Sequence, residues 1–449
     1  MEPKDSAAGK GITRRDFVRG AAFTAAAFTI VPRHVLGRGF IAPSDKLNVA
    51  AIGIGGMGKN NIAALAPTEN IVALCDIDEV YAAKVFDLYP NAKRYKDYRR
   101  MLETQKDIDG VIIATPDHQH ALQAMTAMKL GKHVYVQKPL AYTVHESREL
   151  AKLAKANPKV VTQMGNQGHS SDDARLINEW IADGAIGKVS EVHVWTNRPV
   201  WPQGIPAPTD NPPVPASLDW DLFLGPAPGR AYHPAYTPFK WRGWVDYGQG
   251  ALGDMGAHLI DHVNWSLKLG YPASVEASST PFNKESYPTA SIVTYTFPAR
   301  GKMSAVTMTW YDGGLLPPKP EELGTEPVDK GGGALYIGDK GKLMHGTYGA
   351  KPRLLPQSRM DAYKQPAPTI ARVGMSHERN WAEASKGNGK ATCPFEYAGP
   401  LNETMLLGVV ALRAPGQKLL WDGPNMKFTN APEVNPFLTR EYRQGWTLL

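Results

Sequence analysis

The sequence lacks several features that identify whole classes of protein. Its 449 residues hold only two cysteines, Cys75 and Cys393, which excludes a scaffold built on disulfides. It has no run of lysine or arginine interleaved with aromatic residues, so nucleic-acid binding has no support. It has no internal repeat, and its apolar runs are too short to cross a bilayer. These absences leave a globular chain of the enzyme or binding class.

The length of the chain predicts two domains, because one hydrophobic core rarely serves so many residues. Hydrophobic residues make up 43% of the sequence and charged residues 21%, which is typical of globular proteins. The 37 prolines and 43 glycines predict long irregular loops. The net charge of +7 is concentrated near the start, since the first forty residues hold seven basic and three acidic side chains.

The N-terminus has the order of an export signal. Thr13-Arg14-Arg15-Asp16-Phe17-Val18-Arg19 precedes a short apolar run from Gly20 to Val31. The paired arginines resemble a twin-arginine signal, which serves proteins exported in the folded state. We therefore expect residues 1–42 to be signal and linker, the export machinery to be a partner, and the protein to be periplasmic or otherwise exported. A disordered tail is the alternative, and membrane anchoring stays open because no cleavage site is evident.

A glycine-rich turn follows the first apolar strand of the chain. Leu47 to Ile52 is apolar and leads directly into Gly53-Ile54-Gly55-Gly56-Met57-Gly58, after which helical spacing begins. The three spaced glycines permit a tight turn, close approach of a pyrophosphate and close packing of helix on strand. Gly53, Gly55, Gly56, Met57 and Gly58 are therefore predicted to bind a dinucleotide. A glycine turn in an unrelated α/β domain is the alternative.

A second strand, Ile71 to Cys75, ends at Asp76, about twenty residues after the glycines. A carboxylate at this point accepts the ribose hydroxyls and repels a 2′-phosphate. The sequence therefore favours NAD over NADP, with Asp76 as the ribose ligand and Asp78 as the alternative.

Strands continue to alternate with helices, which predicts a doubly wound parallel sheet. Val111 to Thr115 and His133 to Val136 are apolar, and polar residues follow each of them. Because strand carboxyl ends line the ligand crevice, these residues are expected beside the cofactor. The predicted cofactor ligands from these ends are Thr115, Pro116, His120, Lys138 and Asn166. A surface-loop role is the alternative for the histidines of this segment.

A helix predicted from Gly253 onward carries the candidate catalytic residues. Asp254 and His258 are four residues apart, so they share one helix face. Oxidation of an alcohol needs a group that takes the hydroxyl proton, and histidine has a suitable pKa. We assign His258 as the base, Asp254 as the group that holds the substrate hydroxyl or orients the imidazole, and Lys138 as the group that stabilises the alkoxide or relays the proton. The alternatives are a buried structural His258 and a metal site with His262; no metal is predicted.

A stretch from Pro199 to Gly250 has little regular pattern and is rich in proline and tryptophan. Long loops with large aromatic residues are usually functional, so we expect a wall over the active site. Trp241 and Arg242 are candidate substrate contacts, together with Gln167 and His169 beyond the sixth strand. Packing of the tryptophans in the interior of the loop is the alternative.

These motifs together resemble the Gfo/Idh/MocA oxidoreductases. The resemblance rests on the glycine run, Thr115-Pro116 with His120, Lys138-Pro139 and Gly253-Asp254-Met255-Gly256-Ala257-His258. It implies an α/β protein: a Rossmann domain over residues 45–166, and over 167–449 a C-terminal α/β domain with a large, mostly antiparallel sheet, often used for homo-oligomer contacts. Members usually have glutamate where this chain has Gln137, which puts the orientation of Lys138 in question.

The resemblance implies an exported, nicotinamide-dependent oxidoreductase that transfers hydride between NAD and a hydroxyl of a small-molecule sugar, polyol or glycoside. Export of a folded, loaded enzyme also predicts tight retention of the nucleotide. Two alternatives remain: an NAD-dependent glycoside hydrolase that oxidises the sugar transiently, and a non-catalytic sugar- or nucleotide-binding protein.

Overall fold

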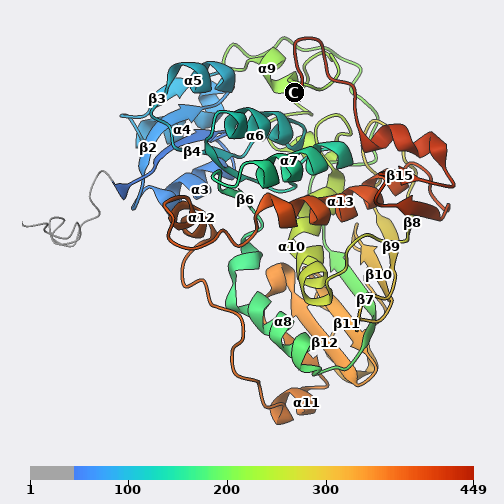
Figure 1. Ribbon diagram of the computed structural model, residues 1–449. Helices are drawn as coiled ribbons and strands as arrows, with labels where there is room; N and C mark the ends of the chain where they lie inside the picture. The colour runs from blue at the N-terminus through green and yellow to red at the C-terminus, as the bar shows by residue number, and fades with distance from the viewer. Residues whose placement is uncertain (1–44, 449) are drawn as a thin grey trace, which may run out of the picture. The chain divides into compact units, whose positions relative to one another are not determined.

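The protein is described by a computed structural model that covers residues 45–448, and two β-sheets organise these residues (Figure 1). The first sheet has six parallel strands in the order β3-β2-β1-β4-β5-β6. Their bounds are β1 Asn48–Ile52, β2 Asn70–Cys75, β3 Lys93–Tyr95, β4 Gly110–Ile113, β5 His133–Val136 and β6 Thr162–Met164. The strand order diverges between β1 and β4, which is where sheets of this kind bind ligands. The predicted doubly wound sheet is confirmed.

Helices connect these strands and cover the sheet. They are α3 Gly58–Leu65, α4 Glu79–Leu88, α5 Tyr98–Thr104, α6 His120–Lys129 and α7 Val144–Ala156. Because helices lie on both faces, all four residues of β4 are buried, which explains its unbroken apolar sequence. The helix starts follow local capping chemistry: Asp78 accepts hydrogen bonds from two backbone N–H groups of α4, and Thr143 with Glu146 forms a capping box on α7.

The second sheet has nine strands in the order β13-β12-β11-β7-β10-β9-β8-β14-β15. Their bounds are β7 Val189–Thr196, β8 Ser274–Ser279, β9 Ser291–Phe297, β10 Val306–Tyr311, β11 Gly332–Gly338, β12 Gly341–Gly346, β13 Arg353–Leu355, β14 Leu419–Asp422 and β15 Lys427–Phe428. Only the β7–β10 pair is parallel among these strands. This confirms the large, mostly antiparallel C-terminal sheet.

Three long helices pack on the second sheet and on each other. They are α8 Asp172–Asp183, α10 Gly250–Leu267 and α13 Phe395–Ala411. Helix α10 contacts α8, α13 and β7, and α13 contacts β8 and β9 (Figure 1). Every residue of α10 from Met255 to Val263 is buried, so this helix is held rigidly between its neighbours. That matters because α10 carries the predicted catalytic aspartate and histidine.

The sequence predicted some boundaries well and others poorly. Strand β5 has the predicted bounds, helix α12 spans His377–Ser385, and a turn at 338–341 joins β11 to β12. The apolar sequence from Leu401 to Leu412 predicts a helix over those residues, but α13 begins earlier, at Phe395, and continues through Pro400 where it packs against α7. The sequence predicts one helix from His118 to Leu130, but this segment begins with a 3-10 turn, η2 Asp117–Gln119, and α6 starts at His120.

Helix α12 belongs to the second half of the sequence but packs against the Rossmann sheet. Trp381 is fully buried, in edge contact with the Tyr135 ring of β5, and a side chain at Gly110 would meet it at 2.8 Å. The Glu378 carboxylate accepts a hydrogen bond of 2.8 Å from Asn61 of α3. The hydrophobic core of the Rossmann half is therefore completed by residues more than two hundred positions later in the sequence.

The predicted export signal, residues 1–42, lies outside the described residues. Among residues 45–448, no helix is both long enough and apolar enough to cross a membrane. Cys75 and Cys393 are free and buried.

Candidate active site

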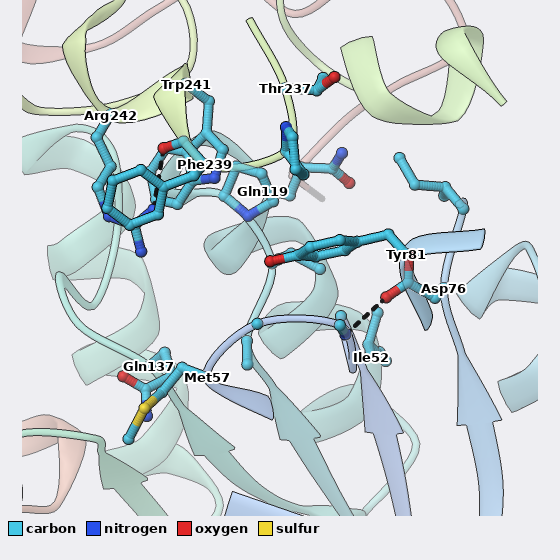
Figure 2. Close-up of a pocket in the computed structure, with 18 of the residues that line it drawn as sticks. Ile52, Met57, Asp76, Tyr81, Gln119, Gln137, Thr237, Phe239, Trp241 and Arg242 are labelled. Carbon is cyan, nitrogen blue, oxygen red and sulfur yellow. Dashed lines mark hydrogen bonds between the residues drawn. The ribbon is translucent and has the colours of Figure 1, made fainter. Parts of the chain in front are cut away.

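A cleft of about 530 Å³ opens at the carboxyl ends of β1, β2, β4 and β5. Its floor is formed by the glycine turn and the segments after these strands, and its roof by the loop between β7 and α10. Figure 2 shows Phe239, Trp241 and Arg242 of that loop across the cleft from Met57. The predicted wall over the site is therefore present. The only helical segments of this loop between β7 and α10 are α9 Trp220–Leu224 and the 3-10 turn η4 Lys240–Gly243.

The glycine turn has a backbone geometry that only glycine permits. Gly53 has φ +79°, and a Cβ there would lie 2.7 Å from the carbonyl oxygen of Ala114. A Cβ at Gly58 would lie 2.0 Å from the carbonyl oxygen of Gly53, so helix α3 can approach β1 only without a side chain. Gly55, Gly56 and Met57 line the cleft in front of the start of α3. This cradle of backbone N–H groups at a helix N-terminus fits a dinucleotide pyrophosphate.

Asp76 lies at the predicted strand end and lines the cleft, but its carboxylate also fixes the glycine turn. One oxygen accepts hydrogen bonds from the N–H groups of Ile54 at 2.8 Å and Gly55 at 3.2 Å (Figure 2). The other accepts from the N–H of Asp78 at 3.0 Å. Burial raises the pKa of the Asp76 carboxyl, and these N–H donors oppose that effect. Asp78 caps α4 instead of standing free in the cleft. Asp76 as a ribose ligand stays a prediction.

Thr115, Pro116 and Gln137 line the cleft, whereas His120 lies behind it. The His120 ring bonds to the Pro139 carbonyl at 2.7 Å and to the Thr115 carbonyl at 2.8 Å. Burial lowers the pKa of His120 to about 4, so the ring is neutral. Its position ties the segment after β4 to the segment after β5, which orients Lys138 indirectly.

Lys138 and Asp254 form the central contact of the cleft. The Lys138 Nζ lies 2.8 Å from Asp254 Oδ1 and 2.9 Å from the Asp254 carbonyl oxygen. Both side chains are about one-seventh exposed, at 15% and 13%. Burial favours the neutral acid, but the charges of Lys138 and Arg242 outweigh it and lower the pKa of Asp254 to about 2. Asp254 therefore stays ionised over the whole physiological range.

His258 lies one helical turn beyond Asp254 on α10 and also lines the cleft. Its pKa lies well below the ordinary value, first because of burial and then because of the Lys138 charge. Its buried Nδ1 has no hydrogen-bond partner among the described residues, and its ring meets the Tyr348 ring edge-on at 4.7 Å. Within the described chain Asp254 bonds to Lys138 and not to His258. The histidine is thus a neutral, buried base.

The tryptophans of the roof divide into two groups. Trp201 and Trp241 line the cleft. Trp220 and Trp244 do not line it and pack only in an aromatic cluster inside the loop, which Trp241 also joins, so the packing alternative holds for these two. The Arg242 guanidinium lies over the rings of Trp241 at 4.2 Å and Phe239 at 4.5 Å. Arg242 also reaches Asp254 Oδ1 with its Nε at 3.4 Å.

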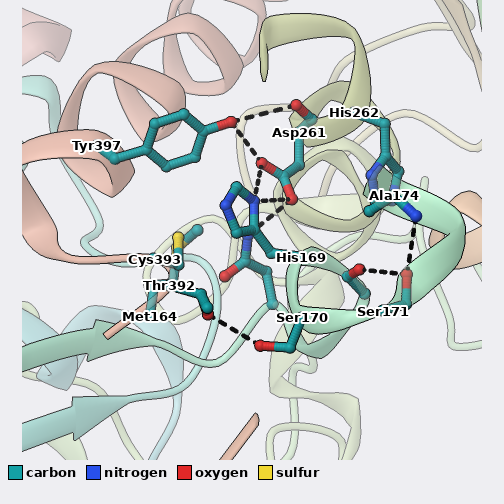
Figure 3. Close-up of polar contacts among 12 residues, drawn as sticks. Met164, His169, Ser170, Ser171, Ala174, Asp261, His262, Thr392, Cys393 and Tyr397 are labelled. Atoms are coloured by element: carbon teal, nitrogen blue, oxygen red, sulfur yellow. Dashed lines mark hydrogen bonds and ion pairs between the residues drawn. The ribbon is translucent and has the colours of Figure 1, made fainter. Parts of the chain in front are cut away.

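Asn166 and His169 are placed outside the cleft lining, in a buried network below α10. The His169 Nδ1 lies 3.0 and 2.9 Å from the two carboxylate oxygens of Asp261, and Asn166 donates to the same carboxylate at 3.0 Å. The Tyr397 hydroxyl donates to it at 2.7 Å (Figure 3). Of the residues predicted beyond β6, only Gln167 lines the cleft. The roles predicted for Asn166 and His169 stay predictions, and the contacts shown are structural.

The cleft residues that the sequence did not predict include Tyr81, Arg198 and Tyr348. Tyr81 covers Gly55 from α4, Arg198 follows β7, and Tyr348 lies in the turn η6 Thr347–Gly349 after β12. In the structure Tyr348 has a φ of +64°, which marks an unusual turn that the sequence does not predict. No group of three or more potential metal ligands is found among residues 45–448.

Comparison with known families assigns both halves of the chain. Residues 47–164 match the Gfo/Idh/MocA oxidoreductase family model described as an NAD-binding Rossmann fold. Residues 187–448 match the model of the family's C-terminal alpha/beta domain. The two matches together cover most of the described residues.

Curated relatives align over part of the chain. A glycosyl hydrolase family 109 protein of Shewanella sp. strain MR-4 is 29% identical over 205 residues, which is 40% of this chain and 44% of that protein. Inositol 2-dehydrogenase of Salmonella typhimurium is 31% identical over 151 residues, 33% of this chain and 45% of that enzyme. The chain therefore spans under half the length of the curated relatives it matches.

Solved structures share the fold over most of the chain. The WlbA dehydrogenase from Bordetella pertussis, solved with NADH and UDP-GlcNAcA, has a TM-score of 0.60 and 17% identity, covering 84% of this chain and 99% of that one. Levoglucosan dehydrogenase, solved with NADH and levoglucosan, has a TM-score of 0.56 and 19% identity, covering 82% and 97%. At these identities the likeness shows the fold alone.

The geometry of the glycine turn predicts the effect of adding one methyl group. Gly58→Ala places a Cβ 2.0 Å from a backbone oxygen that cannot swing away, so the turn must shift. We expect the Kd for NAD to rise about tenfold to a hundredfold, measured by calorimetric titration.

The matched control is Gly229→Ala, because a Cβ there meets nothing within 4 Å. It should keep the Kd of the original protein. A Gly58→Ala protein that keeps both its melting temperature and its affinity for NAD would show that this turn does not hold the dinucleotide.

Proposed function

Because the chain belongs to the Gfo/Idh/MocA oxidoreductase family, we propose that it transfers hydride between NAD and a hydroxyl group of a sugar, polyol or glycoside. One observation carries the proposal. The ionised Lys138–Asp254 pair and the neutral His258 lie in the same cleft as the glycine turn that fits the dinucleotide. The sugar-type ligands in the solved structures named above, and the match to inositol 2-dehydrogenase, support the substrate class.

The residues of the cleft supply what alcohol oxidation requires. NAD, when bound, provides the hydride acceptor. Neutral His258 can take the hydroxyl proton, because its ring lines the cleft and its lowered pKa keeps it unprotonated. The Lys138 ammonium stabilises negative charge on the substrate oxygen, and Asp254 fixes that ammonium from the other side. This gives Asp254 the role of positioning Lys138.

The roof of the cleft suits the apolar face of a sugar ring. Trp201 and Trp241 line it and are mostly buried, at 6% and 8% exposed, so their rings are held in place before substrate binds. Aromatic faces present flat apolar surface at low entropic cost. The C–H face of a sugar or polyol would pack there while its hydroxyls face Lys138 and His258.

A second candidate function is glycoside cleavage through transient oxidation of the sugar. The similarity to a glycosyl hydrolase family 109 protein favours it. The same three residues would serve, since the first step is the same removal of hydride and proton. The two functions differ in products: net oxidation accumulates NADH, whereas transient oxidation releases a free sugar without accumulation of NADH.

The assigned roles predict which substitutions abolish activity. Lys138→Ala and His258→Ala should each lower kcat/KM by about a hundredfold to ten-thousandfold, because each removes a group that acts on the reacting oxygen. The assay follows NADH absorbance and released sugar with a panel of sugars, polyols and glycosides.

Lys132→Ala and His145→Ala are the matched controls, since both residues lie outside the cleft lining. They should keep full activity. Unchanged turnover in the Lys138 and His258 variants would refute the site, and sugar binding without turnover on the whole panel would identify a binding protein.

The environment of His258 also predicts the acid limb of the pH profile. Burial and Lys138 lower the pKa of His258 below its ordinary 6.5, while Asp254 and Asp261 oppose the shift and His262 adds to it. His258 is neutral above the lowered pKa and becomes charged only as the pH falls through it. We therefore expect kcat/KM to stay constant as the pH falls through 6.5 and to decline only below. A decline centred at or above 6.5 would contradict the assignment of His258 as the base.

We also propose that the protein is exported through the twin-arginine route. The support is the order of Arg14-Arg15, Phe17 and the apolar run to Val31. Replacing Arg14 and Arg15 by lysine should reduce the exported fraction sharply, as measured by cell fractionation and immunoblotting in a bacterial host. Arg33→Lys is the control. A protein that stays inside the cell with the original sequence, or is exported equally well without the arginine pair, would refute the proposal.

A further inference from the structure

The catalytic end of the cleft holds an excess of positive charge. Three cations approach the single carboxylate of Asp254: Lys138 at 2.8 Å, Arg242 at 3.4 Å and Arg198 at 3.9 Å. The three cationic side chains are between 15% and 28% exposed, so solvent screens them only in part. One carboxylate can balance one of these charges. Two positive charges remain where the substrate must bind.

Among residues 45–448, no other acidic group near this point balances the excess. Burial raises the pKa of Asp117, the acid next to this cluster, to about 8 despite the opposing charges of Arg242 and Lys138, so it is mostly neutral at pH 7. His258 is neutral as well. The remaining carboxylates in the lining are occupied elsewhere: Asp76 holds the glycine turn, Asp78 caps α4, and Asp97 pairs with Arg99 at 2.7 Å.

The two arginines keep hydrogen-bond donors available. Arg198 uses one terminal nitrogen for Asn197 Oδ1 at 2.6 Å, and Arg242 uses one for the Phe239 carbonyl at 3.1 Å. Within the described residues, the Nη2 of each arginine has no acceptor. A guanidinium with an unused edge is suited to a carboxylate or phosphate, which can take two parallel N–H bonds.

The Arg242 guanidinium is also held in place before any ligand binds. It lies over Trp241 at 4.2 Å, Phe239 at 4.5 Å and Trp201 at 6.0 Å (Figure 2). Stacking covers the faces of the guanidinium and leaves its edges for hydrogen bonds. Fixing the side chain in advance lowers the entropic cost of binding an anion there.

From these contacts we propose that the substrate is an anionic sugar, whose carboxylate or phosphate group is bound by Arg198 and Arg242 next to the Lys138–Asp254 pair. The inference rests on the proposed function and names its substrate class. Both arginines share a carboxylate partner with Lys138, so the anionic group lies close to the reacting hydroxyl. The pyrophosphate of the dinucleotide has its own cradle at the start of α3 and does not require these arginines.

The test compares matched neutral and anionic substrates: glucose with glucuronate, galactose with galacturonate, and glucose with glucose 6-phosphate. The sugar acid or the phosphate should have a kcat/KM at least about tenfold above its neutral partner. Arg198→Gln and Arg242→Gln should each reduce that preference about tenfold, mainly through KM. The uronates and the phosphate distinguish the two kinds of anion.

Lys240→Gln is the matched control for loss of charge. Lys240 lies two residues from Arg242 on the same turn but is exposed and outside the cleft lining, so its loss should leave the preference unchanged. The Kd for NAD is measured in every variant. If Arg242→Gln weakens NAD binding and keeps the substrate preference, Arg242 binds the cofactor and the proposed anion site is wrong.

Calorimetry separates this inference from the proposed function. NAD-loaded protein that binds a sugar acid or a sugar phosphate, but not the neutral sugar, and turns none of them over supports the anion site and refutes the oxidoreductase activity. Turnover of neutral sugars as fast as their anionic partners supports the activity and refutes the anion site. Binding of none of these compounds refutes the anion site.

Discussion

The buried ion pair between Lys138 and Asp254 is the contact on which the candidate site depends. Lys138 follows β5 of the Rossmann sheet, whereas Asp254 lies on α10, which packs on the second sheet, so the pair joins the two halves of the chain within the cleft. Removing two charges from water is costly, and the pair repays this only through good geometry and additional hydrogen bonds. Here the ammonium gains a second acceptor, the Asp254 carbonyl oxygen. The energetic cost of burying this ion pair is better explained by its position in the site than by a contribution to the stability of the fold.

Helix α10 links this pair to the interior. Asp254 and His258 face the cleft, and Asp261, one turn further, faces a buried network with His169, Asn166 and Tyr397. Charged contact with His169 and the hydrogen bond from Tyr397 help to keep the pKa of Asp261 low in spite of burial. The network anchors α10 to the 3-10 turn η3 Gln167–Ser170 and to α13. One helix therefore presents Asp254 and His258 to the cleft on one turn and anchors itself on the next, which limits the freedom of His258.

The parts of the site that the sequence predicted are those set by local pattern. The glycine spacing, the strand ends and the i, i+4 relation of Asp254 and His258 are readable within a few residues. Arg198 and Tyr348 were missed because each enters the cleft from a loop whose position depends on the second sheet, and no local pattern marks them. Asn166 and His169 lie beyond the strand end, as predicted. Neighbouring side chains there point in different directions, so Gln167 lines the cleft while Asn166 and His169 face the interior. Only their hydrogen bonds to Asp261, which is distant in the sequence, show this.

Gln137 stands where members of the family usually have glutamate, and this difference affects the charge of the cleft. Its Nε2 donates to Asn61 Oδ1 at 3.1 Å, and Asn61 in turn donates to Glu378 Oε1 at 2.8 Å. A glutamate at 137 has no hydrogen to donate, so this orientation of Asn61 needs the amide. The carboxylate of this network belongs to Glu378, which does not contact Lys138. Position 137 therefore contributes no negative charge next to Lys138. Asp254 is then the only carboxylate in contact with Lys138 among the described residues, which leaves the positive charge of both arginines uncompensated.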